Sequence, residues 1–273
     1  MKTTPLIHFL ESFQKNGMLL SLDEMVLLYP VAITRIEMEK QCEELVMQGS
    51  LKRSGREYRL TGGEPTTGWL SLQERLRKKE WLLRCVARVP WVSAVCISGS
   101  ATFTKSHPGG DIDICIITSP QRLFLVRLMV LSLFALFGQR RRRASAHIAD
   151  TLCLNAMYES DRLYVPYPKR TIFSAREVVH TYAWSDPEGH WAHFIQTNKT
   201  WVRQKLPNFV LAQSSDTRTE RLPERRGAMA QFFDVCNSIA KYGQLTYMKK
   251  HVTNELVTDS QLWLHPNTRE KYT

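Results

Sequence analysis

A Gly-Ser pair and an Asp-x-Asp pair, each bordered by an apolar run, constrain the fold of this chain more than any other feature. The first run, residues 91–97, is short and contains several β-branched residues, which predicts a buried strand. It leads into Gly99 and Ser100, where the backbone can turn tightly and offer amide and hydroxyl groups to a phosphate. The second run, residues 112–117, predicts another strand. We expect the two strands to be neighbours in one sheet.

The two aspartates predict a metal site at the start of the second strand. Side chains alternate along a strand, so Asp111 and Asp113 project from the same face. Adjacent carboxylates repel each other unless a cation lies between them, and Mg²⁺ prefers oxygen ligands of this kind. An ordinary loop followed by an exposed strand is the alternative. The Gly-rich loop at residues 108–110, placed between a Gly-Ser turn and an apolar Asp-x-Asp strand, favours the metal site.

Gly99, Ser100, Asp111 and Asp113 together resemble the motif of the nucleotidyltransferase superfamily. The resemblance implies that a helix beginning at the Gly-Ser pair binds the triphosphate of an NTP such as ATP. It also implies that the two aspartates hold two Mg²⁺ ions. Lys105 lies in the loop between the two motifs, and its charge predicts a contact with a phosphate.

The same resemblance implies a third Asp or Glu on the next strand, which would complete the metal ligands and help to deprotonate an acceptor hydroxyl. Asp150 is the predicted third carboxylate, because it precedes the apolar run at residues 151–158. Asn155 lies on the more polar face of that run and offers an amide oxygen. Glu177 is a further candidate, although Ser174-x-x-Glu177 is typical of a helix capping box.

The residues before the first composition break, at 61–65, predict a unit of their own. Apolar spacing and turn residues predict three helices and two short strands, over residues 6–13, 22–28, 36–47, 50–53 and 57–60. This is the plan of a winged helix. The third predicted helix contains four glutamates, which would repel DNA phosphates, so a protein contact or a packing role is favoured. With the metal motif, this region resembles bacterial proteins that combine a winged helix with a nucleotidyltransferase domain, over nearly the whole chain.

The chain has 273 residues, enough to bury a sizeable core. We predict an α+β fold with a winged-helix-like domain at residues 1–63, a nucleotidyltransferase core with a mixed sheet at 66–165, and a C-terminal helical region at 166–273. Its six cysteines are scattered and include no Cys-x-x-Cys pair, which predicts reduced, buried thiols in a cytoplasmic protein and argues against both a disulfide framework and a zinc site.

One segment, residues 123–137, is strongly apolar. It is shorter than the ~20 residues needed to span a bilayer, so we predict a buried helix and no transmembrane segment. Residues 118–120 read as its N-terminal cap, and Gly138 as its end. Peripheral contact between anionic lipid and the arginines at 140–143 is the less favoured alternative.

The net charge of +11 suggests a polyanionic partner. The basic clusters at residues 75–79, 140–143, 218–226 and 249–250 are more typical of solvated faces, and no basic stretch is interleaved with aromatic residues as in proteins that stack on bases. We therefore predict a Mg²⁺-dependent enzyme that moves a nucleoside monophosphate from an NTP to an acceptor hydroxyl. The acceptor is unknown, and a small molecule is favoured over nucleic acid. The alternative is a catalytically inactive binding or regulatory module with the same fold.

Overall fold

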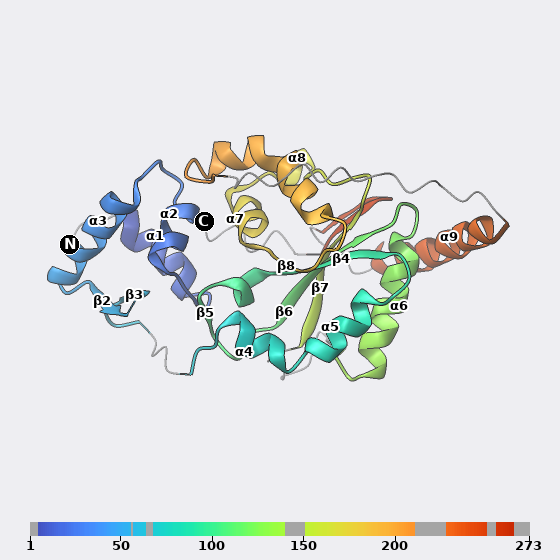
Figure 1. The fold of residues 1–273 in the computed structure, drawn as a ribbon, viewed down its shortest axis with the longest axis horizontal. Coiled ribbons are helices and arrows are strands. Elements are labelled where there is room, and N and C mark those ends of the chain that lie inside the picture. The colour runs from blue at the N-terminus through green and yellow to red at the C-terminus, as the bar shows by residue number, and fades with distance from the viewer. Residues whose placement is uncertain are drawn as a thin grey trace.

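The protein is built around a six-stranded mixed sheet with helices on both faces (Figure 1). The computed structural model describes residues 5–55, 57–63, 68–139, 151–210, 228–249 and 255–264. The sheet has the strand order β8-β4-β6-β7-β10-β9. Helices α7 and α8 lie on one side of it and α4, α5 and α6 on the other, while α1–α3 lie beyond one end (Figure 1).

The helices are α1 (Pro5–Gln14), α2 (Leu22–Leu28), α3 (Arg35–Met47), α4 (Leu72–Arg77), α5 (Glu80–Ala87), α6 (Leu123–Leu136), α7 (Ile172–His180), α8 (His190–Lys205) and α9 (Ala228–Lys249). The strands are β1 (Met18–Leu19), β2 (Leu51–Ser54), β3 (Glu57–Leu60), β4 (Val92–Ser98), β5 (Lys105–Ser106), β6 (Ile112–Thr118), β7 (Leu152–Glu159), β8 (Tyr182–Ser185), β9 (Leu256–Val257) and β10 (Gln261–Trp263). Short 3-10 helices occupy Gly99–Thr102 and Tyr167–Lys169.

The two apolar runs around the Gly-Ser and Asp-x-Asp motifs form neighbouring strands, as predicted. Strand β4 runs antiparallel to β6, and Ser98 lies opposite Asp113. Strand β6 runs parallel to β7, with Asp113 opposite Cys153. Alternate residues of β6 face two different cores: Ile114 packs in the cluster that includes α5 and α6, and Cys115 packs in the cluster that includes α7 and α8. By this alternation, Asp113 lies on the α7–α8 face of the sheet.

The region after residue 165 differs from the helical region predicted for it. It supplies three strands of the main sheet: β8 pairs with the free side of β4, and β10 pairs with β7 and with β9. These strands are two to four residues long, too short to carry a recognisable alternation of apolar and polar residues. They form because the edges of β4 and β7 offer unpaired backbone groups. The predicted domain boundaries stay a prediction.

The three helices and the hairpin expected at the N-terminus are present. Capping boxes begin two of the helices, with Ser21 and Glu24 at α2 and Thr34 and Glu37 at α3. The hairpin β2–β3 follows α3, and β1 pairs with β5 of the central region, which attaches this unit to the core. The assignment of a winged helix stays a prediction.

Helix α6 is buried against the sheet as expected, but it begins three residues later than the predicted cap. The carboxylate of Glu159, at the end of β7, accepts hydrogen bonds from the backbone N–H groups of residues 121–123. A side chain from the neighbouring strand thus caps α6. Thr118 does not cap it, because Thr118 is the last residue of β6. Gly138 ends the helix region with a φ of +65°, a left-handed conformation that suits glycine.

Helix α9 covers the outer side of α6 through polar contacts. Asn237 accepts a hydrogen bond from the backbone N–H of Leu125, and Gln244 accepts one from Arg127. Within the ranges that the structure describes, no helix is both long and apolar enough to cross a membrane.

Candidate metal and phosphate site

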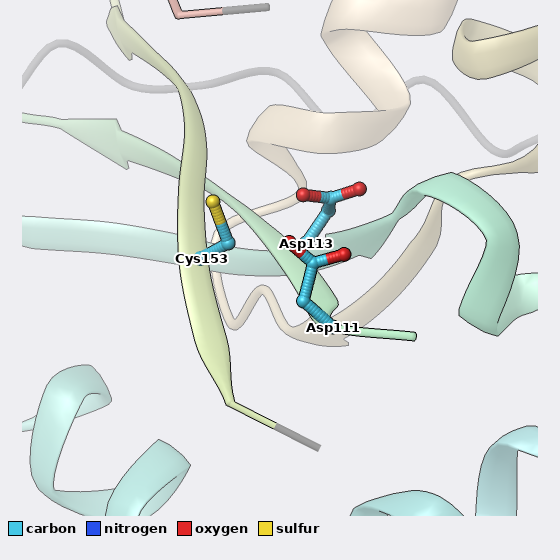
Figure 2. A group of neighbouring side chains, drawn as sticks. All are labelled: Asp111, Asp113 and Cys153. Atoms are coloured by element: carbon cyan, nitrogen blue, oxygen red, sulfur yellow. The ribbon is translucent and has the colours of Figure 1, made fainter. Parts of the chain in front are cut away.

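Three potential metal ligands converge on the α7–α8 face of the sheet. The ligand atoms of Asp111, Asp113 and Cys153 all lie within 4.8 Å of one another. Figure 2 shows the three side chains projecting to the same side of strands β6 and β7. Asp113 is only 3% exposed and Asp111 is 9% exposed, whereas Cys153 is half-buried. Two carboxylates that are nearly buried and adjacent form a place where a cation would be stabilised.

The Gly-Ser turn is in direct contact with this cluster. Gly99 follows β4 and has a φ of +72°, in the left-handed region that side chains other than glycine rarely adopt. A Cβ at this position would lie 2.2 Å from Oδ2 of Asp113, so the carboxylate occupies the space of the missing side chain. Ser100 faces the loop before Asp111, because its Oγ would lie 3.6 Å from a Cβ built on Gly110. The turn and the aspartates therefore form one site, and the turn opens a 3-10 helix of four residues.

A fully buried arginine holds the loop that leads into Asp111. The guanidinium of Arg75, on α4, is 0% exposed and donates hydrogen bonds to the Oγ of Ser106 at 3.0 Å and to the carbonyl oxygen of Asp111 at 3.1 Å. It also donates to the carbonyl oxygen of Gly110. Arg75 is thus an exception to the solvated basic face expected at residues 75–79, in which Arg77 and Lys78 are exposed. Sequence reasoning missed this role, because residues 75 and 111 are far apart in the chain.

A hydrogen-bonded chain links the Gly-Ser turn to the N-terminal helices. Thr102 donates to the carbonyl oxygen of Gly99 at 2.8 Å, and its Oγ1 lies 2.9 Å from Nδ1 of His180. The other ring nitrogen of His180 lies 2.9 Å from Oε1 of Glu24. The ring also stacks on Phe103, with centroids 4.0 Å apart. The Thr102 hydroxyl uses its one hydrogen on Gly99, which leaves its oxygen as an acceptor on the side of His180.

Glu24 is held ionised by the same network. Burial raises the pKa of its carboxyl group, but the hydrogen bond and the charge of His180, with hydrogen bonds from Thr104 and Ser21, outweigh burial and lower the pKa. A buried carboxylate with several donors is stable in its charged form. The N-terminal helices therefore contact the site through a buried polar network that includes α7.

Of the three candidates for the third metal ligand, the structure describes Asn155 and Glu177. Asp150 lies outside the described residues. Asn155 is buried and donates its side-chain amide to Oγ of Ser98 at 3.0 Å, a bond that crosses the face of β6 beside Asp113. The register between β6 and β7 shifts at Asn155. Its side chain therefore does not follow the regular up-and-down alternation that begins at Cys153.

Glu177 lies on the same face of the sheet, near Cys115 and Tyr158. Its charge helps to raise the pKa values of Cys115 and Tyr158, behind the dominant effect of burial. Its carboxylate is not among the three clustered ligands found in the described part of the chain. The predicted capping box at residues 174–177 is wrong, because α7 is capped by Thr171, whose side chain accepts a hydrogen bond from Ser174 N–H.

Lys105, the predicted phosphate ligand, is paired with the N-terminal hairpin. Its Nζ lies 3.1 Å from Oε1 of Glu57 on β3. The sequence contained no signal for this pair, because the antiparallel pairing of β5 with β1 decides which side chains come near Lys105.

The donor set fits a divalent cation. Two carboxylates supply the oxygen ligands that Mg²⁺ prefers, and the backbone of Gly99 lies against one of them. The third member of the cluster, Cys153, is a ligand that sequence reasoning missed. Its place on the polar side of the predicted strand was visible, but its position opposite Asp113 depends on the parallel register.

Comparisons with known proteins do not assign the chain to a family. No protein-family model matches it, and searches of curated proteins and of solved structures each gave no significant match. The geometry of the site is thus the basis for inferring what this mixed α/β protein does.

Proposed function

We propose that the protein is a divalent-cation-dependent nucleotidyltransferase that moves a nucleoside monophosphate from an NTP to an acceptor hydroxyl. The observation that carries the proposal is the direct contact between the Gly99 backbone and the Asp113 carboxylate. It brings a turn suited to phosphate oxygens next to two carboxylates suited to Mg²⁺. The resemblance of the two motifs to the nucleotidyltransferase superfamily supports the same conclusion.

Each group has a defined part in the proposed reaction. The amides and the hydroxyl at Gly99 and Ser100 would bind the β- and γ-phosphates, and Asp111 and Asp113 would hold one or two Mg²⁺ ions. A bound ion supplies charge neutralisation at the triphosphate. Arg75 fixes the loop before Asp111 through the carbonyl of that residue, so it is a positioning residue.

The reaction is a substitution at the α-phosphorus. A bond forms between the acceptor oxygen and the α-phosphorus, and the bond from that phosphorus to the oxygen bridging to the β-phosphate breaks. Pyrophosphate leaves with the bonding electrons, and the hydroxyl proton passes to a base. Asp150 is the predicted base, and catalysis would come from charge neutralisation together with alignment of the acceptor with the phosphorus.

The charge of α3 and the state of the cysteines support the proposed acceptor and location. A small acceptor held beside the C-terminal helices is favoured, because the four glutamates of α3 would repel DNA phosphates. The six cysteines are free thiols in the structure, which supports a reducing compartment such as the cytoplasm.

The test measures nucleotide binding and transfer separately. Calorimetry with each Mg²⁺-NTP is combined with transfer assays that use labelled NTPs and candidate acceptors. Asp111→Asn and Asp113→Asn should abolish binding or turnover while the melting temperature stays unchanged or rises, since like-charge repulsion is relieved. Asp23→Asn, at an exposed carboxylate that pairs with Arg35, is the matched control. Unchanged Mg²⁺-NTP affinity in both site variants would refute the assignment.

An inactive binding module is the second candidate. It is favoured by one observation: Cys153, and not a carboxylate, lies opposite Asp113 on the next strand. Nucleotide binding that depends on both aspartates, without release of pyrophosphate in the presence of any acceptor tested, would support the inactive module.

A further inference from the structure

Cys153 occupies the position on the strand next to Asp113 from which a third side chain can reach the proposed ion. The two residues are opposite each other in the parallel register of β6 and β7, so their side chains leave the sheet on the same side. Figure 2 shows the sulfur of Cys153 and the carboxylate of Asp113 on that side.

The spacing of the three donor atoms suits one ion. A tetrahedral ion with a metal–sulfur bond of about 2.3 Å and metal–oxygen bonds of about 2.0–2.2 Å holds its donors about 3.5 Å apart. The ligand atoms of Asp111, Asp113 and Cys153 are already within 4.8 Å of one another. Movements of little more than about 1 Å, within reach of side-chain rotation, would bring all three to one ion.

The thiol of Cys153 differs from the other thiols of the sheet in its access to solvent. Cys96 and Cys115 are buried, and burial raises the pKa of each, so they behave as inert core side chains. Cys153 is half-buried, and it is the cysteine that faces the two carboxylates.

A sulfur donor changes which ion is preferred. Mg²⁺ requires oxygen ligands in near-ideal octahedral geometry, and a thiolate does not satisfy it. Zn²⁺ and Co²⁺ accept thiolate together with carboxylate, and Zn²⁺ does so in tetrahedral sites. A set of two carboxylates and one thiol is therefore better matched to these ions than to Mg²⁺.

We propose that Cys153 is a ligand that makes this centre select a thiophilic divalent ion, such as Zn²⁺ or Co²⁺, over Mg²⁺. The inference rests on the proposed divalent-ion site at Asp111 and Asp113, and it deepens that proposal by naming the class of ion. On binding, the thiol releases its proton to solvent and the sulfur forms a bond to the ion. A second ion bound through nucleotide oxygens can still be Mg²⁺.

The test uses the full chain and the metals alone. Co²⁺ titrations followed by absorption should show a sulfur-to-cobalt charge-transfer band in the unmodified protein, and equilibrium dialysis should show Zn²⁺ and Co²⁺ bound far more tightly than Mg²⁺. Cys153→Ser should remove the band and weaken Zn²⁺ and Co²⁺ binding by at least about tenfold. Cys236→Ser, at another half-buried thiol, should change neither.

A second variant covers the case in which Cys153→Ser folds poorly. Cys153→Asp replaces the sulfur with a third carboxylate, so Mg²⁺ should bind more tightly than in the unmodified protein and the margin by which Zn²⁺ and Co²⁺ exceed Mg²⁺ should narrow. Melting curves of both variants show whether they are folded.

The outcomes separate this inference from the proposed function. If no sulfur band appears, or if Cys153→Ser leaves the band and both affinities unchanged, Cys153 is not a ligand. If Mg²⁺-NTP binding still depends on Asp111 and Asp113 in that case, the proposed function stands alone. If Asp111→Asn and Asp113→Asn also leave all ion and nucleotide binding unchanged, both proposals fail.

Discussion

The carboxylate of Asp113 fills the space that a side chain on Gly99 would occupy. A Cβ there would lie 2.2 Å from Oδ2 and 3.1 Å from Cγ of Asp113. Real Cβ atoms do not approach other atoms so closely, so a side chain at residue 99 would have to displace the Asp113 carboxylate.

Gly99→Ala should therefore damage the site more than it damages the fold. The methyl group must displace the Asp113 carboxylate, so Mg²⁺-NTP affinity should fall at least about tenfold, measured by calorimetry. The left-handed backbone adds about 1–2 kcal/mol of destabilisation. Gly49→Ala is the matched control, because Gly49 also has a φ of +72° but has nothing within 4 Å of its added methyl group. Equal losses of ligand affinity in the two variants would contradict the steric coupling.

Arg75→Met should loosen the loop that carries Asp111. The substitution keeps most of the apolar stem but leaves buried acceptors at Ser106, Gly110 and Asp111 without their donor. Loss of hydrogen bonds to a buried charged group costs about 1.5–3 kcal/mol, measurable as the free energy of unfolding in urea. Arg77→Met, at an exposed arginine on the same helix, should be nearly neutral. Similar unfolding free energies for the two variants would show that the buried contacts contribute little.

Glu24→Gln should weaken the contact between the N-terminal helices and the Gly-Ser turn. The carboxylate faces His180 and accepts hydrogen bonds from Thr104, so its loss should cost about 1–3 kcal/mol. Glu37→Gln is the control, because Glu37 has the same capping position on α3 but is exposed.

The effect of Glu24 should also depend on pH. Its folded-state pKa is lowered below 4.5, so its stabilisation is present above about pH 4.5 and is lost as the pH falls through the lower folded value. The difference in unfolding free energy between the unmodified protein and Glu24→Gln should therefore shrink in acid. A difference that stays constant from pH 7 to pH 3 would exclude the ionised pair.

Glu159 should have the opposite pH dependence. Burial, helped by the charge of Asp161, raises its pKa from 4.5 to about 7, although backbone N–H groups of α6 oppose this. A raised pKa means that the stability contribution is complete below about pH 4.5 and is lost as the pH rises through 7. The full shift corresponds to about 3 kcal/mol, and solvent screening reduces the expected loss to about 1–2 kcal/mol.

Glu159→Gln keeps an oxygen acceptor for the N-terminus of α6 and removes the charge. Its unfolding free energy should be nearly constant from pH 5 to pH 8, where the unmodified protein loses stability. Asp161→Asn should move the loss to lower pH, because a neighbouring negative charge is removed. A pH profile of the unmodified protein that matches that of Glu159→Gln would refute the raised pKa.

Local patterns in the sequence were enough to predict much of the fold. Strands β4 and β6, the turn at Gly99 and the helix at residues 22–28 are encoded within a few residues, through apolar runs, backbone freedom and the spacing of apolar side chains. The common face of Asp111 and Asp113 follows from strand alternation alone. These features needed no knowledge of distant contacts.

The tertiary structure decided the features that join distant segments. The parallel register places Cys153 opposite Asp113, the burial of α4 brings Arg75 to the loop before Asp111, and the end of β7 supplies Glu159 as the cap of α6. None of these pairs has a local signature, because each depends on which strand edge or helix face is available once the core has formed. The sequence by itself determined the paired carboxylates and the turn, and only the packing of distant elements determined the third donor beside them.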